Sequence, residues 1–296
     1  MCAARSRRLT GSMSENHGKT ILVIGATGKV GRRLTEQLRA AGHDVRGVSR
    51  RTAIPFDWHD ASTWGAALEG VSAAYIIPPD EPIPAREFVT AAANAGVQRL
   101  VSQSGRRIHV LVEAAGAGPD DVAMYAMQEA LKHSGVEWTV LQANNFNQNF
   151  SEGDNLPALL AGELALPLRG TTEPFIDVED IAAVAVAVLT EDGHSGQIYE
   201  LSGPESISFE DAVQIIAKAA GKEITFRAED PEDYVEALKA AGVPEPLIEF
   251  LDVMYGVMRE GKIADVADGV QAVLGREPVA FADWAARAAK EGSWVS

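Results

Sequence analysis

The chain has 296 residues, of which 46% are hydrophobic and 23% are charged, a composition typical of a globular protein. Its formal net charge is -16, and such a surface repels phosphate backbones, so we expect no nucleic-acid partner. The only cysteine is Cys2, which excludes a disulfide, a redox CxxC pair and a core cysteine nucleophile, and the six histidines lack metal-ligand spacing.

Residues 1–19 are basic and polar, and no apolar segment follows Arg7 and Arg8 before Ile21. They do not resemble a secretory signal, so we expect a disordered tail. No apolar run is long enough to cross a bilayer. The sequence therefore predicts a cytoplasmic protein without a membrane partner.

From residue 20 to 143, short apolar runs alternate with longer amphipathic ones. The first run is continuous and β-branched and ends at Gly25, as expected of a buried strand. Alternation with short connections predicts a parallel sheet covered by helices on both faces. Strands are expected at 20–25, 44–50, 72–79, 97–104 and 137–143, and helices at 29–42, 61–70, 84–96 and 120–135.

The pattern changes after Asn144, where residues 144–167 are irregular and rich in amide and aromatic side chains. A strand and helix over 174–192 and a strand over 196–203 are expected to return to the sheet. The remainder, from about Pro204, is mostly helical. Helices are expected there at 208–221, 231–242, 244–261 and 281–292.

Residues 23–31 read VIGATGKVG and place Gly25, Gly28 and Gly31 between the first strand and the first helix. Such a loop allows a tight turn, a close approach of backbone to a pyrophosphate, and close packing of the helix on the sheet. We predict that it binds a dinucleotide, although a tight structural turn is the alternative. An ATPase loop is excluded, because Val23 and Val30 replace the required glycine and Ser/Thr. The binding residues expected in the loop are Gly25, Thr27, Gly28, Lys29, Val30 and Gly31.

The residues at the end of the second strand distinguish an NAD(H) site from an NADP(H) site. NAD enzymes usually place an acidic residue there, whereas this chain has Ser49, Arg50 and Arg51. Arginine can pair with a 2′-phosphate, so we predict NADP(H). Arg50 is the better candidate, because one of the two arginines is expected to be a solvated surface residue.

Together these features predict an α/β protein with a Rossmann-type, doubly wound parallel sheet and a smaller, mostly helical C-terminal lobe. Residues 20–203 would form the NADP-binding domain, with 151–174 contributing to the substrate lobe. Residues 204–296 would form the C-terminal substrate-binding lobe. The oligomeric state is expected to be a monomer or homodimer.

The chain resembles the NmrA-like group of atypical short-chain dehydrogenases from Thr20 to about Trp284. The resemblance is carried by GATGKVG, FDWHDASTWGAALEGVSAAYIIPP, QEALKHSGVEWTVLQANNFNQN, FIDVEDIAAVA, GQIYELSGPESISFEDAV and LGREPVAFADW. It implies a Rossmann domain, NADP(H) and a cleft against the C-terminal lobe. By the same resemblance Asp57 would lie near the adenine, Ile77 and Pro78 along the adenosine, Ser102 and Gln103 near the nicotinamide ribose, and Asn144, Asn145 and Phe146 at the nicotinamide end.

Two positions depart from the group. Gln142 and Ala143 stand where the block is usually written Arg-Pro. The lysine that several reductases of the group carry four residues after Tyr125 is replaced by Glu129, and Lys132 lies about two turns from Tyr125. Without that lysine the Tyr125 hydroxyl could donate a proton but would be a poor base, because a nearby carboxylate disfavours phenolate. Alcohol oxidation is therefore disfavoured.

Reduction of a strong hydride acceptor such as a quinone, enone or iminium needs little proton assistance. Tyr125 and His109 are the candidate catalytic residues, although Tyr125 could simply pack against the sheet and His109 could be a solvated loop residue. Tyr125, Asn145, Asn149 and Phe150 are candidates for substrate binding, although asparagines also favour turns. Met254, Tyr255 and Met258 are expected in the core.

The function predicted first is NADPH-dependent reduction of a small conjugated carbonyl, quinone or imine-type acceptor, in the style of secondary metabolism. A non-catalytic NADP(H)-sensing regulator remains an alternative, as does a redox-neutral isomerase or cyclase on the same fold. The sequence does not identify the substrate.

Overall fold

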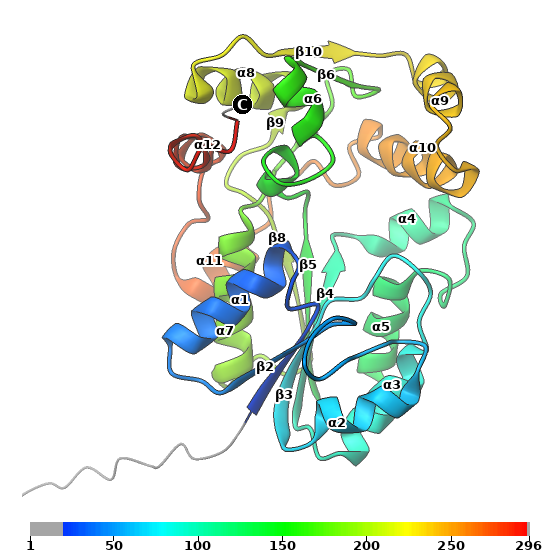
Figure 1. The fold of residues 1–296 in the computed structure, drawn as a ribbon, viewed down its shortest axis with the longest axis vertical. Helices are drawn as coiled ribbons and strands as arrows, with labels where there is room; N and C mark the ends of the chain where they lie inside the picture. Colours follow the sequence, from blue (N-terminus) through cyan, green and yellow to red (C-terminus); the bar gives the residue numbers. More distant parts are fainter. Residues whose placement is uncertain (1–19, 295–296) are drawn as a thin grey trace, which may run out of the picture.

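A computed structural model describes residues 20–294. Six parallel strands form the main sheet in the order β2-β1-β3-β4-β5-β8 (Figure 1). Each strand is a short run of mostly apolar residues whose side chains alternate between the two faces. The strands are β1 (Thr20–Ile24), β2 (Val45–Val48), β3 (Val71–Ile76), β4 (Arg99–Gly105), β5 (Glu137–Ala143) and β8 (Gln197–Leu201).

Helices cover both faces of this sheet, and each face has its own core. Leu22 and Ile24 of β1 face one core, whereas Ile21 and Val23 face the other, as expected of a strand buried on both sides. One face is covered by α2 (Trp64–Leu68), α3 (Ala85–Asn94) and α5 (Ala123–Lys132), and the other by α1 (Lys29–Ala40), α7 (Val178–Thr190) and α11 (Gly269–Leu274). The predicted doubly wound α/β fold is therefore confirmed.

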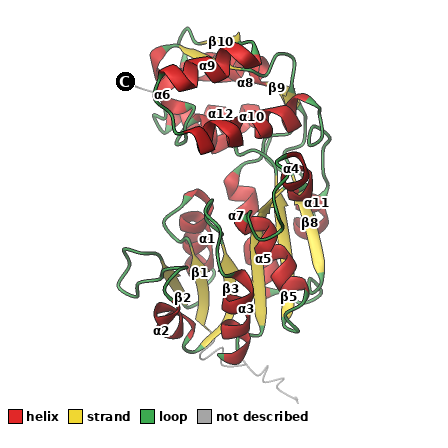
Figure 2. Cartoon of the chain, turned by 90° about the vertical axis from the view of Figure 1, so that its right-hand side faces the viewer, coloured by secondary structure: helices red, strands yellow, loops and turns green. Residues whose placement is uncertain are grey.

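A second lobe lies beyond the carboxyl ends of the strands (Figure 2). Its core is aromatic, and the Phe150 and Phe175 rings contact each other and the rings of Phe209 and Phe281. It contains α6 (Leu156–Ala161), α8 (Phe209–Ala220), α9 (Pro231–Ala240), α10 (Glu245–Arg259) and α12 (Phe281–Lys290), a parallel pair of β6 (Glu163–Leu166) and β10 (Thr225–Ala228), and an antiparallel pair of β7 (Thr172–Glu173) and β9 (Ile207–Ser208).

Several details differ from the sequence-based expectation. Residues 175–177 do not return to the sheet, since Ile176 makes only an isolated bridge to Phe146. Beyond residue 203 the chain comes back to the large lobe, where α11 packs against α7 and β8. Four short helices were not expected: α4 (Ile108–Ala114), η2 (Asn147–Phe150), α6 and α11, whereas η1 (Ala61–Thr63) and α2 together occupy the helix expected at 61–70. The tail expected at residues 1–19 lies outside the described residues.

Across residues 20–294, no helix is both long enough and apolar enough to cross a membrane. Nor does this part of the chain gather three or more His, Cys, Asp or Glu side chains in a way that could hold a metal ion.

Candidate cofactor and substrate site

The glycine loop packs tightly against the start of α1. Gly25 has a φ of 83°, and a Cβ added at Gly31 would lie 2.1 Å from the Gly25 carbonyl oxygen, so α1 approaches the loop only because residue 31 is glycine. A Cβ at Gly28 would meet only that same oxygen, at 3.4 Å, and the outer side of the loop is open. Gly28 caps α1 without a side-chain hydrogen bond, so the first-turn N–H groups remain available to an anion.

The adenosine side of the predicted cofactor path follows the ends of β2 and β3. Arg50 and Arg51 are exposed after β2, and neither guanidinium forms an ion pair with any residue that the structure describes. The Ser49 Oγ accepts a hydrogen bond from the Arg51 N–H at 3.3 Å. Asp57 caps a turn through its Oδ1, which accepts from the His59 N–H at 2.9 Å.

After β3, Ile77 lies against the glycine loop, and its N–H donates to the Ile24 carbonyl at 3.3 Å. Pro78 is buried beside it. These positions are compatible with a ligand that runs along the carboxyl ends of β1, β2 and β3, and the assignments of Asp57, Ile77 and Pro78 stay predictions.

A cavity of about 300 Å³, here called the main cavity, lies between the two lobes beside the glycine loop. Its floor comes from the ends of β4 and β5, and its outer wall comes from α4 and α10. A second cavity of about 270 Å³, the outer chamber, shares Asn145, Asn149 and three α10 residues with it and adds Asp80 and Asp154. The main cavity is lined by Lys29, 103–108, Leu111, Met124, 143–146, Asn149, Phe250, Met254, Val257, Met258 and Ile263.

Many of the predicted nicotinamide-end and substrate residues meet in the main cavity. Gln103, Asn144, Asn145, Phe146 and Asn149 all line it. Gln103 lies on β4, Asn144, Asn145 and Phe146 directly follow β5, and Asn149 lies on η2. The Gln103 Oε1 accepts a hydrogen bond from the buried Tyr75 hydroxyl at 3.2 Å. The structure thus brings together residues up to 46 positions apart at one edge of the sheet, as the carboxyl ends of parallel strands require.

Four predicted residues lie elsewhere. Ser102 is fully buried in β4, and its Oγ donates to the Gln103 carbonyl, so it faces away from the main cavity. Tyr125 is half-buried on α5 and does not line the cavity, whereas its neighbour Met124 does. His109 is exposed on α4, not in a loop. Phe150 is fully buried in the aromatic core of the small lobe and borders only the outer chamber.

Glu129, which replaces the lysine that several reductases of the group carry, is an ordinary surface residue. Its carboxylate forms an ion pair with Lys132 at 2.6 Å on the same helix. Neither side chain reaches the main cavity. Gln142, which stands where the group usually has arginine, also has a hydrogen-bond partner. Its Nε2 donates to the Gln128 Oε1 at 2.7 Å in a buried contact between β5 and α5.

The Lys29 side chain enters the main cavity from the first turn of α1. Its Nζ donates to the Asn149 Oδ1 at 2.9 Å. A Cβ at Gly153 would lie 2.9 Å from this Nζ and 2.9 Å from the Asn149 Cα, so glycine at 153 leaves room for the contact. The ammonium therefore bridges the glycine loop and the small lobe.

Glu173 is a buried carboxylate behind the cavity that the sequence did not reveal. Its Oε2 accepts hydrogen bonds from the Nδ2 of Asn144 and, at 3.1 Å, from the Nδ2 of Asn145. Its Oε1 has no hydrogen-bond partner among the described residues. Burial raises the pKa of Glu173 to about 7, although hydrogen bonds from the two amides and the charge of Arg106 oppose the shift. Since both amide nitrogens are engaged, Asn145 is left with its oxygen for a ligand.

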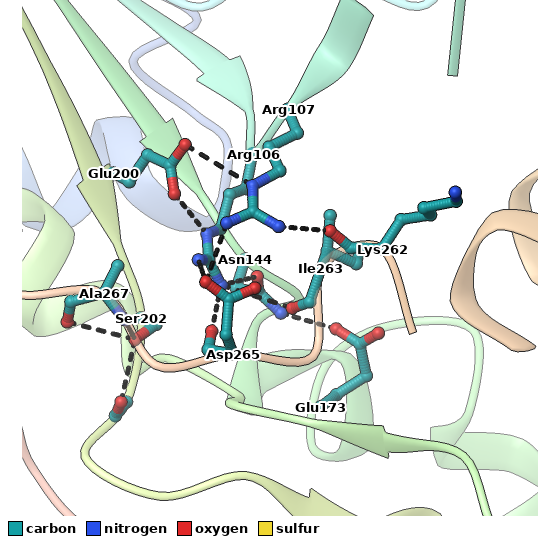
Figure 3. Close-up of polar contacts among 11 residues, drawn as sticks. Arg106, Arg107, Asn144, Glu173, Glu200, Ser202, Lys262, Ile263, Asp265 and Ala267 are labelled. Atoms are coloured by element: carbon teal, nitrogen blue, oxygen red, sulfur yellow. Dashed lines mark hydrogen bonds and ion pairs between the residues drawn. The ribbon is translucent and has the colours of Figure 1, made fainter. Parts of the chain in front are cut away.

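Arg106 and Arg107 follow β4 and bind the connection from α10 to α11, residues 260–268 (Figure 3). The Arg106 Nε donates to the Glu200 carboxylate at 2.8 Å, and its Nη2 donates to Asp265 at 2.8 Å. Arg107 donates to the same Asp265 carboxylate and to the Lys262 carbonyl. Arg107 has a φ of 49°, which is uncommon for a residue with a side chain and turns the chain into α4. The network holds α10 over the main cavity.

Sequence reasoning missed most of the apolar wall. Phe250, Met254 and Met258 line the cavity from α10, and the two methionines also pack in the core of the small lobe, where they were expected. A lobe core and a cavity wall both require apolar residues at helical spacing, so this pattern could not separate them. Ser104 carries a clearer signal, since the residue lines the cavity and its buried Oγ has no hydrogen-bond partner among the described residues. Such a group awaits a polar ligand atom.

The chain was compared with known proteins. A family model described as the NmrA-like family matches residues 17–284. The (4-alkanoyl-5-oxo-2,5-dihydrofuran-3-yl)methyl phosphate reductase of Streptomyces griseus is 32% identical, over 91% of this chain and 98% of that protein. An NAD(P)H azoreductase of Xenophilus azovorans is 30% identical, over 90% and 96%. The structure of an NADPH-dependent quinone oxidoreductase of Escherichia coli, in complex with NADPH, aligns with a TM-score of 0.74 over 90% of this chain and 99% of that one; at 22% identity it shows a shared fold.

Proposed function

The chain belongs to the NmrA-like family, and from this premise we propose that it is an NAD(P)H-dependent reductase of small conjugated acceptors. The observation that carries the proposal is the position of the main cavity. It adjoins the open glycine loop and combines an apolar wall with the amide and hydroxyl groups of Gln103, Ser104 and Asn145. A flat acceptor with one polar atom suits this combination.

The curated relatives support the same reaction class. Two proteins at least 30% identical over nine-tenths of this chain are named reductases, one of a conjugated furanone phosphate and one an azoreductase. The names describe different acceptors, so they favour a common mode of reduction and leave the acceptor open. Azo groups and conjugated carbonyls are both strong hydride acceptors.

NADP(H) is the cofactor that we propose. Arg50 and Arg51 extend into solvent after β2 with no carboxylate partner in the described structure, and no acidic side chain stands at the strand end to accept from a ribose. A 2′-phosphate would provide the missing anionic partner. The N–H groups of Lys29, Val30 and Gly31 would hold the pyrophosphate, and Thr27 lies exposed on the same loop.

The chemistry of the hydride comes from the reduced nicotinamide when it is bound. The residues of this chain would orient the acceptor and exclude water. Phe146, Met254 and Met258 provide apolar surface on either side of the cavity, while the Ser104 hydroxyl can donate a hydrogen bond to the carbonyl oxygen of the acceptor. No proton-abstracting tyrosine is required for this direction of reaction.

A panel of acceptors tests the proposal. NADPH and NADH oxidation would be followed at 340 nm with quinones, enones, azo dyes and imines. We expect at least one class to consume NADPH faster than the enzyme-free blank, with saturation in both substrates. If calorimetry detects NADPH binding while every acceptor gives the blank rate, the reductase proposal is overturned and a sensing role becomes the better explanation.

A further inference from the structure

The cationic side chains that line the main cavity differ in whether they form ion pairs. Three cations line it, namely Lys29, Arg106 and Arg107, and no Asp or Glu does so within residues 20–294. Both arginines are neutralised by Glu200 and Asp265, which lie behind the wall. Lys29 instead donates to the neutral Asn149 amide and forms no ion pair with a described residue. A net positive charge therefore remains at one point of a largely apolar cavity.

Asn149 and Gly153 fix the position of the Lys29 ammonium. Asn149 lies on η2, which is held by Phe150 in the core of the small lobe and by the buried Gln148, whose Nε2 donates to Asp177 at the start of α7. Gly153 packs against the Lys29 Nζ and the Asn149 backbone, where any side chain would collide with both. Since the Asn149 oxygen takes one of the three ammonium hydrogens, two remain for a ligand.

We propose that the Lys29 ammonium contacts the oxygen of the acceptor and stabilises the negative charge that reduction places there. The inference rests on the proposed reductase function and narrows its substrate class. Neutral acceptors that end as an oxyanion, such as quinones and enones, are favoured over cationic iminium ions. The Lys29 backbone N–H still serves the pyrophosphate, so one residue contacts both ligands through different groups.

The reaction balances with the two components already named. A hydride brings two electrons and one hydrogen to a carbon of the acceptor, and NADPH becomes NADP⁺. The π pair displaced from that carbon moves through the conjugated system to the oxygen beside the Lys29 Nζ. The ammonium donates a proton to this oxygen, and solvent returns a proton to the amine. In a desolvated cavity a fixed positive charge favours the developing oxyanion far more than water does.

The acids around the cavity do not reverse this preference. Glu152, which precedes Gly153, is already paired with Arg32 and Arg33. Glu173 lies behind the Asn144 and Asn145 amides, which occupy its one hydrogen-bonded oxygen, and Arg106 partly offsets its charge. Asp80 and Asp154 line the outer chamber and not the main cavity. A cationic acceptor would therefore meet a like charge at Lys29 and no lining carboxylate.

A phenol that becomes coloured on ionisation tests the site independently of turnover. With the enzyme saturated with NADP⁺, 4-nitrophenol would be titrated from pH 5 to 9 by absorbance. We expect binding to lower the pKa of the phenol, and Lys29→Met to remove that shift, because the bound phenolate loses its ammonium partner. Arg39→Met, which deletes a charge from the exposed last turn of the same helix, should keep the shift. Identical titration curves for the wild type and Lys29→Met would overturn the inference.

Kinetics then separate a substrate role from a cofactor role. With menadione, Lys29→Met should lower kcat by about 10²-fold, as loss of an oxyanion donor does, while the NADPH dissociation constant changes less than about threefold. Lys29→Arg should recover part of the rate. With N-methyl-3,4-dihydroisoquinolinium, the rate of Lys29→Met should equal or exceed that of the wild type. Weaker NADPH binding with an unchanged kcat would assign the Lys29 side chain to the cofactor and contradict the inference.

The two proposals fail in different ways. If the wild type reduces no acceptor, the reductase function fails, but the nitrophenol titration still decides whether Lys29 forms an oxyanion site. If menadione is reduced and Lys29→Met reduces it equally well, the function stands and the role of Lys29 is wrong.

Discussion

Arg106 and Asp265 lie 159 residues apart in the chain and form a 2.8 Å ion pair that joins β4 to the connection after α10. The Arg106 side chain is 1% exposed, whereas the Asp265 side chain is 54% exposed. The ion pair therefore holds the wall of the main cavity in place from its buried side (Figure 3). If Glu200 and Asp265 were removed, water could not hydrate the buried Arg106 guanidinium.

Arg106→Met should destabilise the protein by roughly 2–4 kcal/mol. The substitution leaves Asn144 and two backbone carbonyls without their donor, although Glu200 and Asp265 can still reach water. Urea unfolding followed by circular dichroism measures the change. Arg107→Met is the matched control, because its side chain is 32% exposed, and it should cost less than about 1 kcal/mol. Equal losses for the two variants would mean that burial of Arg106 is not what matters.

Two glycines of the same loop should respond differently to alanine. In Gly31→Ala the new methyl would lie 2.1 Å from the Gly25 carbonyl oxygen, so α1 must move and the melting temperature should fall by several degrees. In Gly28→Ala the nearest atom is 3.4 Å away, so the melting temperature should change little. Cofactor affinity in Gly28→Ala should nevertheless fall at least about tenfold, because the methyl would occupy the open side of the loop. Calorimetry and thermal unfolding together distinguish these outcomes.

Arg50→Glu should weaken NADPH binding by roughly ten- to hundredfold and leave NADH binding almost unchanged. A 2′-phosphate would lose a charged donor and gain a like charge, whereas the 2′-hydroxyl of NADH would meet a carboxylate that can accept from it. Fluorescence titration with both cofactors measures the ratio. Arg51→Glu, the adjacent exposed arginine, is the comparison and should have the smaller effect. A uniform loss for NADPH and NADH would show that Arg50 does not select the phosphate.

Glu173 should make stability depend on pH near neutrality. Its folded-state pKa of about 7 lies above the ordinary glutamate value, so the folded protein holds the proton more tightly than the unfolded chain. This stabilising contribution is complete below the unfolded-state pKa and is lost as the pH rises through about 7. Glu173→Gln keeps an oxygen for the Asn144 and Asn145 amides and removes the titration. It should therefore be more stable than the wild type at pH 8, by at most about 3 kcal/mol, and similar to it at pH 5. Parallel slopes for both proteins between pH 5 and 8 would contradict the assignment.

Tyr125 and His109, although they are the catalytic candidates that the sequence suggests, are expected to be dispensable. Neither lines the main cavity, so Tyr125→Phe and His109→Ala should retain kcat/KM within roughly threefold of the wild type. Asn145→Ala is the positive comparison; it removes an amide side chain that lines the cavity and should cost about tenfold. A large loss in Tyr125→Phe would require a closed form of the enzyme in which α5 approaches the substrate.

The large lobe was predictable because its signals are local. Continuous β-branched runs predicted β1 and β5, helical spacing predicted α1, and the glycines between them predicted the loop. Residues at the carboxyl ends of β4 and β5 could be placed in one site since parallel strands end at a common edge. The short segments α4, β6 and β10 escaped prediction, because four to seven residues carry too little periodicity and β6 pairs with β10 about sixty positions away.

What the sequence determined, then, is the parallel sheet, the dinucleotide loop and the absence of a lysine at position 129. What only the tertiary structure decided is which side chains share the cavity. Lys29 reaches it because the small lobe folds back and offers the Asn149 oxygen, and Met254 and Met258 reach it because Arg106 anchors the connection after α10. Such contacts depend on long-range packing and desolvation, which no local pattern of residues encodes.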